Sequence, residues 1–534
     1  MARTYISLFS SAGIGCYGFK MNGFKCIATN ELLGVRLDIQ RANNKCEYDS
    51  GYICGDARSE ETHAKILAEI DRWRNEHNLQ QVDVVFATPP CQGMSTANYK
   101  KTDHEQIRNS LVVEAIKIIR MIRPKVFVFE NVRAFMKSIC TDISGQDMLI
   151  KDSIFNNLSE YYNIHWKVIN FKDYGVPSSR PRTLVIGTSS ELDYVTPLHL
   201  FPTRSNEISL EKSIGAFRRL DYCEKDPNDP LHFARPFPKY MLDWIKDLKE
   251  GETAFDNPDD RKPCTFDAKG NRIINKGAYM GNKYRRLIWS RPGACIATRS
   301  DVMSSQDTIH PCDNRVLSIR ELMTLMTIPN DFKWTDHDDT LTVENTDEYL
   351  KENEGNIRRC IGEAVPTQIG YAIANKVKAM LDYEDFRKGV NVDNKDKNYY
   401  VLVNNILSES FDFINAYYEI LQLCQDANDI KIGIDSLSAF VGYMPMVSAY
   451  LSHIDKINVD VYLNNEEEKK KLKTILGMYD FGINIRVNGV IKPLCSFYDI
   501  RICDEGCSEY KPVFAKGMKR IDRKEIKSVQ LSLF

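Results

Sequence analysis

The sequence has no long hydrophobic run: no apolar stretch approaches the roughly 18 residues that a membrane-spanning helix needs. It also opens without a secretory leader, because its first four residues lead directly into a predicted strand. Fifteen cysteines in a chain of this kind point to a reducing compartment rather than to a disulfide-bonded secreted protein. We therefore expect a cytoplasmic protein with no membrane association.

Metal-ligand spacing and an overall basic charge are also missing. Cys495, Cys503 and Cys507 lie close together, but neither a fourth cysteine nor a nearby histidine completes a tetrahedral site, so we expect no metal. The 71 lysines and arginines are balanced by 73 acids. Any surface that binds nucleic acid must therefore be local.

Strands and turns at the amino terminus are typical of a nucleotide-binding α/β domain. Residues 5–9 form a predicted strand, and glycines at 13, 15 and 18 follow it in a turn that leads into a helix. Such glycines let the backbone approach a ligand closely. Two further predicted strands end in acids, Glu31 and Asp56, and such folds bind ribose hydroxyls through an acid placed like Glu31.

A cysteine and a glutamate follow two further predicted strands. Val84–Ala87 leads through Thr-Pro-Pro to Cys91, and residues 125–132 end in Glu130, Asn131 and a valine. The carboxyl ends of parallel strands share one crevice, so the thiol and the carboxyl group should converge. Taken alone, the thiol fits a buried small hydrophobe equally well, and the carboxylate fits a helix cap or an ion pair.

These motifs, in this order, resemble those of the cytosine-C5 DNA methyltransferase family, and the resemblance covers roughly residues 4–380. The loop at 8–13 resembles the family's S-adenosylmethionine loop, Glu31 its ribose acid and Asp56 its adenine-contacting acid. The remaining matches are the nucleophile motif at 89–92, the Glu-Asn-Val motif at 130–132, the paired arginines Arg180 and Arg182, and later segments at 315–321, 329–332 and 361–366.

Three motifs depart from the family pattern, at four positions. Ser178 stands where a glutamine usually precedes the paired arginines, and Glu363 stands where the final motif usually has asparagine. In the first loop, Ser11 and Ile14 replace common glycines. None of these changes removes a group that the reaction uses.

The resemblance implies a reaction that requires a covalent step, because C5 of cytosine is a poor nucleophile. Cys91 would add to C6 of the base, and protonated Glu130 would stabilise the charge that develops at N3. The activated C5 would then take the methyl group, after which a base removes the C5 proton and the thiol is eliminated. Arg180 and Arg182 would hold the base edge or a phosphate.

The implied cofactor is S-adenosyl-L-methionine, and the implied substrate is double-stranded DNA with the target cytosine flipped out of the duplex. The residues expected to contact the cofactor are Phe9, Ser10, Ala12, Gly13, Gly15, Glu31, Asp56, Ala87, Pro89, Leu111, Ala364 and Val365.

Basic residues gather where the family keeps its target-recognition region. Residues 261–299 contain ten lysines or arginines and one acid, whereas 205–260 contains eight bases and thirteen acids. A solvated face is the alternative, but so one-sided a run predicts a DNA-facing surface. The expected DNA contacts are Gln92, Ser95, Arg261, Lys262, Arg272, Lys283, Arg285, Arg286 and Arg299.

The predicted fold class is α/β, with a Rossmann-like methyltransferase domain, a smaller target-recognition lobe and an additional C-terminal α/β or α+β domain. Helical periodicity is expected at 62–80, 105–122 and 401–425, and C-terminal strands near 430–434, 457–462 and 483–487. The expected boundaries are 1–190 plus 355–383 for the catalytic domain, 191–350 for the target-recognition lobe, 384–399 for a linker, 400–520 for a domain of unknown role and 521–534 for a flexible tail.

The last five residues resemble the bacterial sliding-clamp-binding motif. Leu531, Leu533 and Phe534 would enter a groove on the clamp while Gln530 makes polar contacts; the same apolar tail could instead fold back on its own domain.

The sequence thus predicts a sequence-specific DNA cytosine-C5 methyltransferase of a bacterium, near the nucleoid, or of a phage in its host's cytoplasm. It would serve restriction-modification, with an endonuclease partner, or epigenetic marking. The alternatives are a tRNA cytosine-C5 methyltransferase and a catalytically silent module that binds DNA or the clamp.

Overall fold

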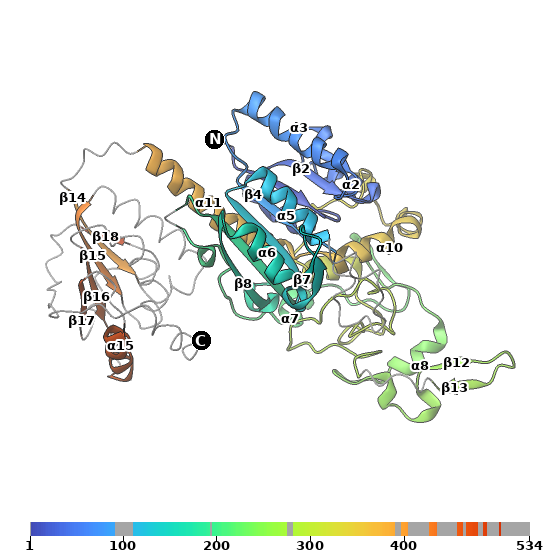
Figure 1. Cartoon of the computed structure of the whole chain (residues 1–534). Coiled ribbons are helices and arrows are strands. Elements are labelled where there is room, and N and C mark those ends of the chain that lie inside the picture. The colour runs from blue at the N-terminus through green and yellow to red at the C-terminus, as the bar shows by residue number, and fades with distance from the viewer. Residues whose placement is uncertain are drawn as a thin grey trace. The chain divides into compact units, whose positions relative to one another are not determined.

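The computed structural model describes residues 2–90, 111–192, 195–274, 281–389, 397–403, 427–434, 457–462, 466–478, 484–488 and 501–503. The chain forms two compact units (Figure 1). The first comprises Met1–Leu192, Thr196–Phe201 and Ser205–Asn375, and the second comprises Lys376–Phe534 with two three-residue segments at 193–195 and 202–204. The motifs that resemble the methyltransferase family lie in the first unit.

A seven-stranded sheet of order β3-β2-β1-β4-β5-β9-β8 forms the centre of the first unit. The first five strands of this order are parallel, while β9 pairs antiparallel with β5 and with β8. The order reverses between β1 and β4, which is where open α/β sheets bind ligands at their carboxyl ends. The strands are β1 (Thr4–Leu8), β2 (Lys25–Glu31), β3 (Tyr52–Cys54), β4 (Val84–Ala87), β5 (Val126–Val132), β8 (Tyr162–Asn170) and β9 (Pro181–Ser189).

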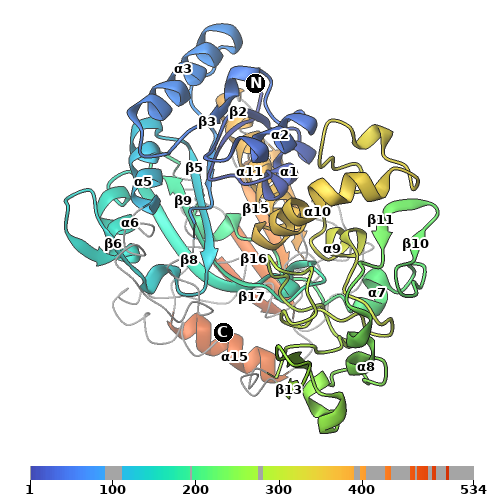
Figure 2. The same cartoon turned by 90° about the vertical axis from the view of Figure 1, so that its right-hand side faces the viewer.

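Helices cover both faces of this sheet (Figure 2). Side chains alternate across each strand, so β1 presents Ile6 to one face and Tyr5 to the other. Ile6 belongs to a buried cluster that includes Ile70 and Ile119, whereas Tyr5 stacks on Phe19. The helices of the first cluster are α3 (Glu60–His77), α5 (Leu111–Ile122) and α6 (Ile150–Leu158), and those of the opposite face include α1 (Ile14–Met21) and α2 (Gly34–Ala42).

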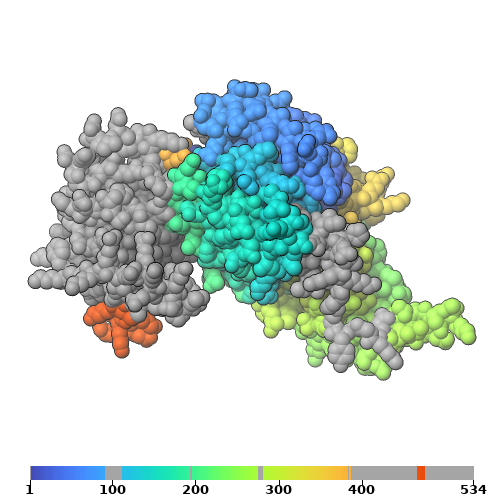
Figure 3. Space-filling view, viewed as in Figure 1, coloured from blue at the N-terminus to red at the C-terminus, as the bar shows by residue number. Residues whose placement is uncertain are grey.

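The rest of the first unit packs around two further cores. One joins α1 and α2 to α7 (Leu210–Ile214), α9 (Ile319–Leu325) and α10 (Thr346–Glu363); the other forms around α8 (Leu242–Ile245). The hairpin of β12 (Cys264–Phe266) and β13 (Arg272–Ile274) projects from this part of the unit (Figure 3). Two other antiparallel pairs are β6 (Ile139–Thr141) with β7 (Asp147–Leu149), and β10 (Lys225–Asp226) with β11 (Asp229–Phe233).

The expected helices of the first unit are confirmed with small shifts of their ends. The helix expected at 62–80 is α3, which ends earlier because Asn78 adopts the left-handed conformation that terminates helices. The helix expected at 105–122 is described from Leu111 to Ile122, and residues 105–110 lie outside the described residues.

The second unit contains a five-stranded sheet of order β17-β16-β15-β14-β18. Its first four strands are parallel and β18 is antiparallel, which identifies an α/β arrangement. The elements are β14 (Lys397–Val403), β15 (Ala427–Ile434), β16 (Ile457–Tyr462), α15 (Glu466–Met478), β17 (Asn484–Asn488) and β18 (Arg501–Cys503).

Two expectations about this region are corrected. Residues 401–403 are not helical: they belong to β14, where aromatic and branched residues pair with β15. Of the linker expected at 384–399, residues 384–389 belong to α11 (Thr367–Gly389) and residues 397–399 belong to β14. Among the described helices, none has both the length and the apolar character needed to cross a membrane.

Candidate active site

The loop between β1 and α1 has the geometry of a ligand cradle. Phe9, Ser11 and Gly13 adopt φ angles of 55°, 45° and 78°, so three alternate residues lie in the left-handed region. The buried hydroxyl of Ser10 holds the loop to the sheet through the Thr29 hydroxyl at 2.8 Å. Gln40 Nε2 donates to Ser10 Oγ at 2.9 Å. The loop is therefore anchored through Ser10 to β2 and to α2.

Glu31 lies at the end of β2 and contacts this loop directly. Its Oε2 accepts from the Ser11 amide at 2.8 Å, and its Oε1 accepts from the amide of Leu32 at 2.9 Å. Oε1 also accepts from the Leu33 amide at 3.3 Å. A carboxylate oxygen has two acceptor positions, so Oε2 can still accept a hydroxyl of a ribose. Leu32 and Leu33 are exposed beside this acid, and the sequence gave no reason to single them out.

Asp56 follows β3 and forms an ion pair with Arg58 at 2.6 Å. The Arg58 hydrogen bond lowers the pKa of the Asp56 carboxyl, so this group stays ionised at neutral pH. Buried Asn30 donates to the carbonyls of Ile53 and Gly55, which ties the end of β3 to β2. The two acids therefore lie on adjacent strand ends, as expected from the sequence.

The final motif packs directly on α1. A Cβ on Gly370 would lie 1.9 Å from the Gly15 carbonyl oxygen, and one on Gly15 would lie 2.8 Å from Val365 Cβ. Only glycine permits such an approach at these two positions. Val365 and Ala364 are thereby held, both buried, beside the start of α1.

Residues 88–90 lead to the nucleophile motif and are anchored on two sides. Thr88 Oγ1 donates to the Phe9 carbonyl at 2.8 Å, and Asn131 Nδ2 donates to the Pro89 carbonyl at 2.8 Å. The backbone that enters the motif is thus fixed both to the ligand loop and to the end of β5. Cys91, Gln92 and Ser95 lie outside the described residues.

Glu130 is buried at the end of β5, and its Oε1 lies 3.3 Å from Arg182 Nε. Burial raises the pKa of the Glu130 carboxyl, and the charges of Arg182 and Arg180 partly oppose that shift. Among the described residues, Oε1 has no hydrogen-bond partner. The carboxyl group is therefore suited to hold a proton and to donate it to a ligand.

The two arginines of the paired motif have different surroundings. Arg182 adjoins Glu130, whereas the buried Arg180 donates to the carbonyls of Ile296 at 3.3 Å and Gly362 at 3.0 Å. Within the described part of the chain, Arg180 Nε is buried and lacks a partner. Arg182 is thus the arginine that lies beside the Glu130 carboxyl, whereas Arg180 ties together distant segments of the chain.

Ser178, the departure before the paired arginines, lies against another segment. Its hydroxyl donates to the Ala294 carbonyl at 2.8 Å, and Ser179 N donates to the Gly293 carbonyl at 2.7 Å. This contact brings residues 293–297 beside Arg180, including Cys295, whose Sγ lies 3.5 Å from Arg180 Nη1. No motif in the sequence pointed to that segment.

The expected DNA contacts divide into buried and accessible cations. Arg286 is buried and donates to the carbonyls of Ile245 and His310, among others, so it is removed from the expected DNA surface. Its guanidinium satisfies interior carbonyls instead. The accessible cations with ion-pair partners are Arg261 with Asp247, Lys262 with Asp259, Arg285 with Asp307 and Arg299 with Asp301.

Two further expected DNA contacts, Arg272 and Lys283, have no carboxylate partner among the described residues. The guanidinium of Arg272 donates to the carbonyls of Asp259 and Lys262, so it ties its hairpin to the preceding segment. Lys283 is half-buried and forms no ion pair with the described part of the chain. It is consequently the cation of this group most readily available to a phosphate.

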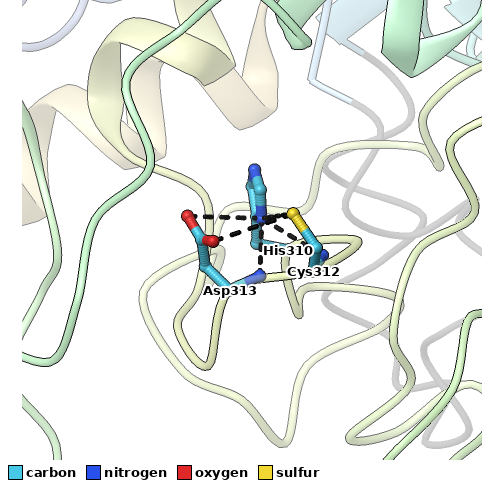
Figure 4. A group of neighbouring side chains, drawn as sticks. All are labelled: His310, Cys312 and Asp313. Carbon is cyan, nitrogen blue, oxygen red and sulfur yellow. Dashed lines mark hydrogen bonds and ion pairs between the residues drawn. The ribbon is translucent and has the colours of Figure 1, made fainter.

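One group of potential metal ligands occurs among the described residues: His310, Cys312 and Asp313 (Figure 4). His310 Nδ1 accepts hydrogen bonds from the amides of Cys312 and Asp313, at 3.3 and 3.0 Å. Burial lowers the pKa of His310 to about 4, so the ring is neutral. Arg219 and Arg315 both pair with Asp313. The ligand atoms therefore already have partners within the protein.

Comparison with known proteins places this arrangement in a family. The family model for C-5 cytosine-specific DNA methylases matches residues 3–379. The chain is 31% identical to the type II methyltransferase M1.HgaI of Avibacterium volantium, over 68% of this chain and 94% of that protein. It is 28% identical to the type II methyltransferase M1.HphI of Haemophilus parahaemolyticus, over 71% and 88%. The chain belongs to the C-5 cytosine-specific DNA methylases, which transfer the methyl group of S-adenosylmethionine to C5 of cytosine in DNA.

Proposed function

We propose that this enzyme methylates a cytosine within one specific duplex sequence through a covalent bond between Cys91 and C6 of the base. The observation that carries this proposal is the arrangement at the ends of β4 and β5. Asn131 holds the backbone two residues before Cys91, and the neighbouring Glu130 is buried beside Arg182. A thiol nucleophile and an acid with a raised pKa would therefore face one base.

In the proposed reaction each residue has one chemical role. The Cys91 thiolate donates an electron pair to C6 and forms the C–S bond, while Glu130 donates a proton or hydrogen bond to N3 as the ring gains charge. Bound S-adenosylmethionine supplies the electrophilic methyl group. After a base removes the proton from C5, the C–S bond breaks and Cys91 leaves as thiolate. Arg182 keeps Glu130 oriented throughout.

The described residues fit the cofactor that the family uses. The loop at 9–13, with its left-handed residues, would present its backbone to the ligand, and Glu31 Oε2 keeps an acceptor position for a ribose hydroxyl. Asp56 remains ionised on the next strand end and can accept from an amino group. We assign the remaining cofactor contacts to Ala12, Gly15, Ala87, Pro89, Leu111, Ala364 and Val365.

We assign the target-recognition role to residues 191–350 and the catalytic role to 1–190 with 355–383. The projecting β12–β13 hairpin and Lys283 lie in the recognition part, and a two-stranded ribbon has dimensions that the DNA major groove admits. Insertion of protein into the duplex would accompany flipping of the target cytosine. Gln92 and Ser95 would contact DNA beside the nucleophile.

The direct test of this proposal uses the purified protein with radiolabelled S-adenosylmethionine. Methyl transfer to duplex DNA but not to total tRNA would support it, whereas transfer to tRNA alone would favour an RNA methyltransferase. The family match argues for DNA. A protein that binds DNA but transfers no methyl group to either substrate would be the silent module.

We also propose that the enzyme serves restriction-modification, near the nucleoid of a bacterium or in the host of a phage. The support is the match to two relatives that are named type II methyltransferases. Methylated genomic DNA would then resist one endonuclease that cuts unmethylated DNA of the same source. If DNA from cells with and without the enzyme is cut equally by every endonuclease of that source, the role is epigenetic marking.

The last five residues lie outside the described part, and we propose that they bind a bacterial sliding clamp. Three apolar side chains and a glutamine at a chain end are suited to a preformed groove. A peptide of residues 520–534 should bind the clamp in a calorimetric titration, and its Phe534→Ala variant should not. Absence of binding by the unmodified peptide would refute the proposal.

A further inference from the structure

A carboxylate at the end of α10 joins two elements of the cofactor site. Glu363 Oε2 accepts from Arg36 Nη2 on α2 at 3.0 Å and from the Ser11 hydroxyl in the cofactor loop at 3.4 Å. The family pattern has asparagine and glycine where this chain has Glu363 and Ser11, so two of its departures are in direct contact. They are spatially one feature although 352 positions separate them.

The partner of this carboxylate is a buried cation. The side chain of Arg36 is 3% exposed, whereas that of Glu363 is 39% exposed. Arg36 also donates to the thiol of Cys360. Burial raises the pKa of this thiol, so it carries no charge at neutral pH. A guanidinium removed from water requires a nearby anion, and removal of that anion leaves an uncompensated charge. Glu363 is the anion that the described residues provide.

Neighbouring contacts prevent Glu363 from moving away. The adjacent Gly362 carbonyl accepts from Arg180 Nη2 at 3.0 Å. A Cβ on Gly362 would lie 2.6 Å from the Ala297 carbonyl carbon, so the backbone here is packed against another segment. The backbone beside Glu363 is thus held in place, which keeps its carboxylate within reach of the Ser11 hydroxyl.

We propose that Glu363 is a positioning residue that holds the cofactor loop through Arg36 and Ser11. It acts on the loop and on the first turn of α2, which follows the ribose acid Glu31. An uncharged side chain at 363 would release Arg36 and let the left-handed loop at 9–13 sample other conformations. Cofactor affinity should fall for that reason. The assignment of this loop to S-adenosylmethionine rests on the proposed function.

The test is calorimetric titration of S-adenosylmethionine into the full-length protein. Glu363→Gln keeps the shape of the side chain and removes its charge, and we expect the dissociation constant to rise about tenfold, which is about 1.4 kcal/mol. Glu363→Asp keeps the charge and should recover most of the affinity. The matched control is Glu352→Gln, an exposed glutamate of the same helix, which should bind the cofactor like the wild type.

Two further measurements separate positioning from loss of structure. Duplex DNA affinity without cofactor should stay close to wild type in Glu363→Gln although its cofactor affinity falls, and the thermal midpoint of Glu363→Asp should match that of the wild type. Unchanged cofactor affinity in Glu363→Gln, or equal loss in Glu363→Asp, would overturn the inference. A wild type that binds the cofactor yet methylates no DNA would refute the proposed function and leave this comparison intact.

Discussion

The side-chain amide of Asn131 donates a hydrogen bond to the carbonyl oxygen of Pro89 at 2.8 Å, across two neighbouring parallel strands. The side-chain oxygen Oδ1 of Asn131 in turn accepts from the Val132 amide at 2.8 Å, which orients the donor. The backbone that leads to Cys91, the proposed nucleophile, is therefore fixed by the residue next to Glu130, the proposed acid. Thr88 fixes the same turn to the cofactor loop from the other side.

Replacement of Asn131 should impair chemistry more than cofactor binding. We expect Asn131→Ala to lower kcat about 100-fold, because a small displacement of a catalytic group has effects of that order. Asn131→Asp places an acceptor against the Pro89 carbonyl and should be at least as damaging. Single-turnover methylation with duplex DNA measures the effect, and a calorimetric Kd for S-adenosylmethionine provides the control. A wild-type rate in both variants would contradict the assignment.

The raised pKa of Glu130 predicts the direction of a pH dependence. The protonated form is the one that donates to the base, so the Glu130-dependent rate should be highest below the folded pKa and fall as pH rises through it. Glu130→Gln should lower the rate about 100-fold or more and remove this limb of the profile. The profile of kcat against pH for the two proteins measures both effects. If kcat of Glu130→Gln still falls as pH rises, another group causes the fall and the prediction is wrong.

The same residue makes a prediction about stability. A folded pKa above the ordinary value means that the folded state holds the proton more tightly, so stability falls as pH rises from the ordinary pKa to the folded one. Glu130→Gln has no carboxyl group to ionise. Its free energy of unfolding, relative to that of the wild type, should therefore increase with pH across that window. Urea unfolding at pH 5 and pH 8 tests this, and a constant difference between the two proteins would contradict it.

A buried ion pair supports the recognition part of the first unit. Arg315 Nη1 lies 2.7 Å from Glu321 Oε2, both side chains are buried, and Arg315 holds the pKa of Glu321 down to about 2. Stability from Glu321 should therefore be complete above the ordinary glutamate pKa and lost as pH falls toward 2. Glu321→Gln should lose about 3 to 5 kcal/mol at neutral pH. Urea denaturation gives the value, and a loss below 1 kcal/mol would exclude the pair as a main support.

Lys283 and Arg286 are close in sequence, yet their replacement should have different effects. Lys283→Ala should weaken duplex DNA binding and reduce its salt dependence, without a change in the thermal midpoint, because we assign this cation to a phosphate contact. Arg286→Ala leaves several buried carbonyls without a donor and should instead lower the thermal midpoint. Fluorescence anisotropy at several salt concentrations and thermal unfolding together measure both. If both variants lose DNA affinity alone, the burial of Arg286 is irrelevant to its role.

The elements around the site could be predicted because their sequence patterns are local. Val84–Ala87 and Val126–Val132 are apolar runs that end in turn or polar residues, and such runs form buried strands with polar groups at their ends. The order in which acids follow strands then indicates a common crevice. The same patterns, with the family resemblance, were sufficient to place Glu31, Asp56 and Glu130.

Contacts between distant segments were not predictable in that way. Arg180 reaches the Gly362 carbonyl across 182 positions, and no local pattern indicates such a pair. The basic run at 261–299 predicted a positive surface, but a count of charges does not show that Arg286 turns inward. Residues 401–403 are valine, leucine and valine, which fit a helix face or a strand, and pairing with β15 decides between them.

The most direct test of the central claim is base-resolution cytosine methylation sequencing of genomic DNA from cells that express the wild type or Cys91→Ala. We predict C5-methylcytosine at one short sequence motif in cells with the wild type and none at that motif with Cys91→Ala, while the variant still binds duplex DNA. Equal methylation by both proteins would contradict the assignment of Cys91 as the nucleophile. No methylation by either would contradict the assignment of DNA as the substrate.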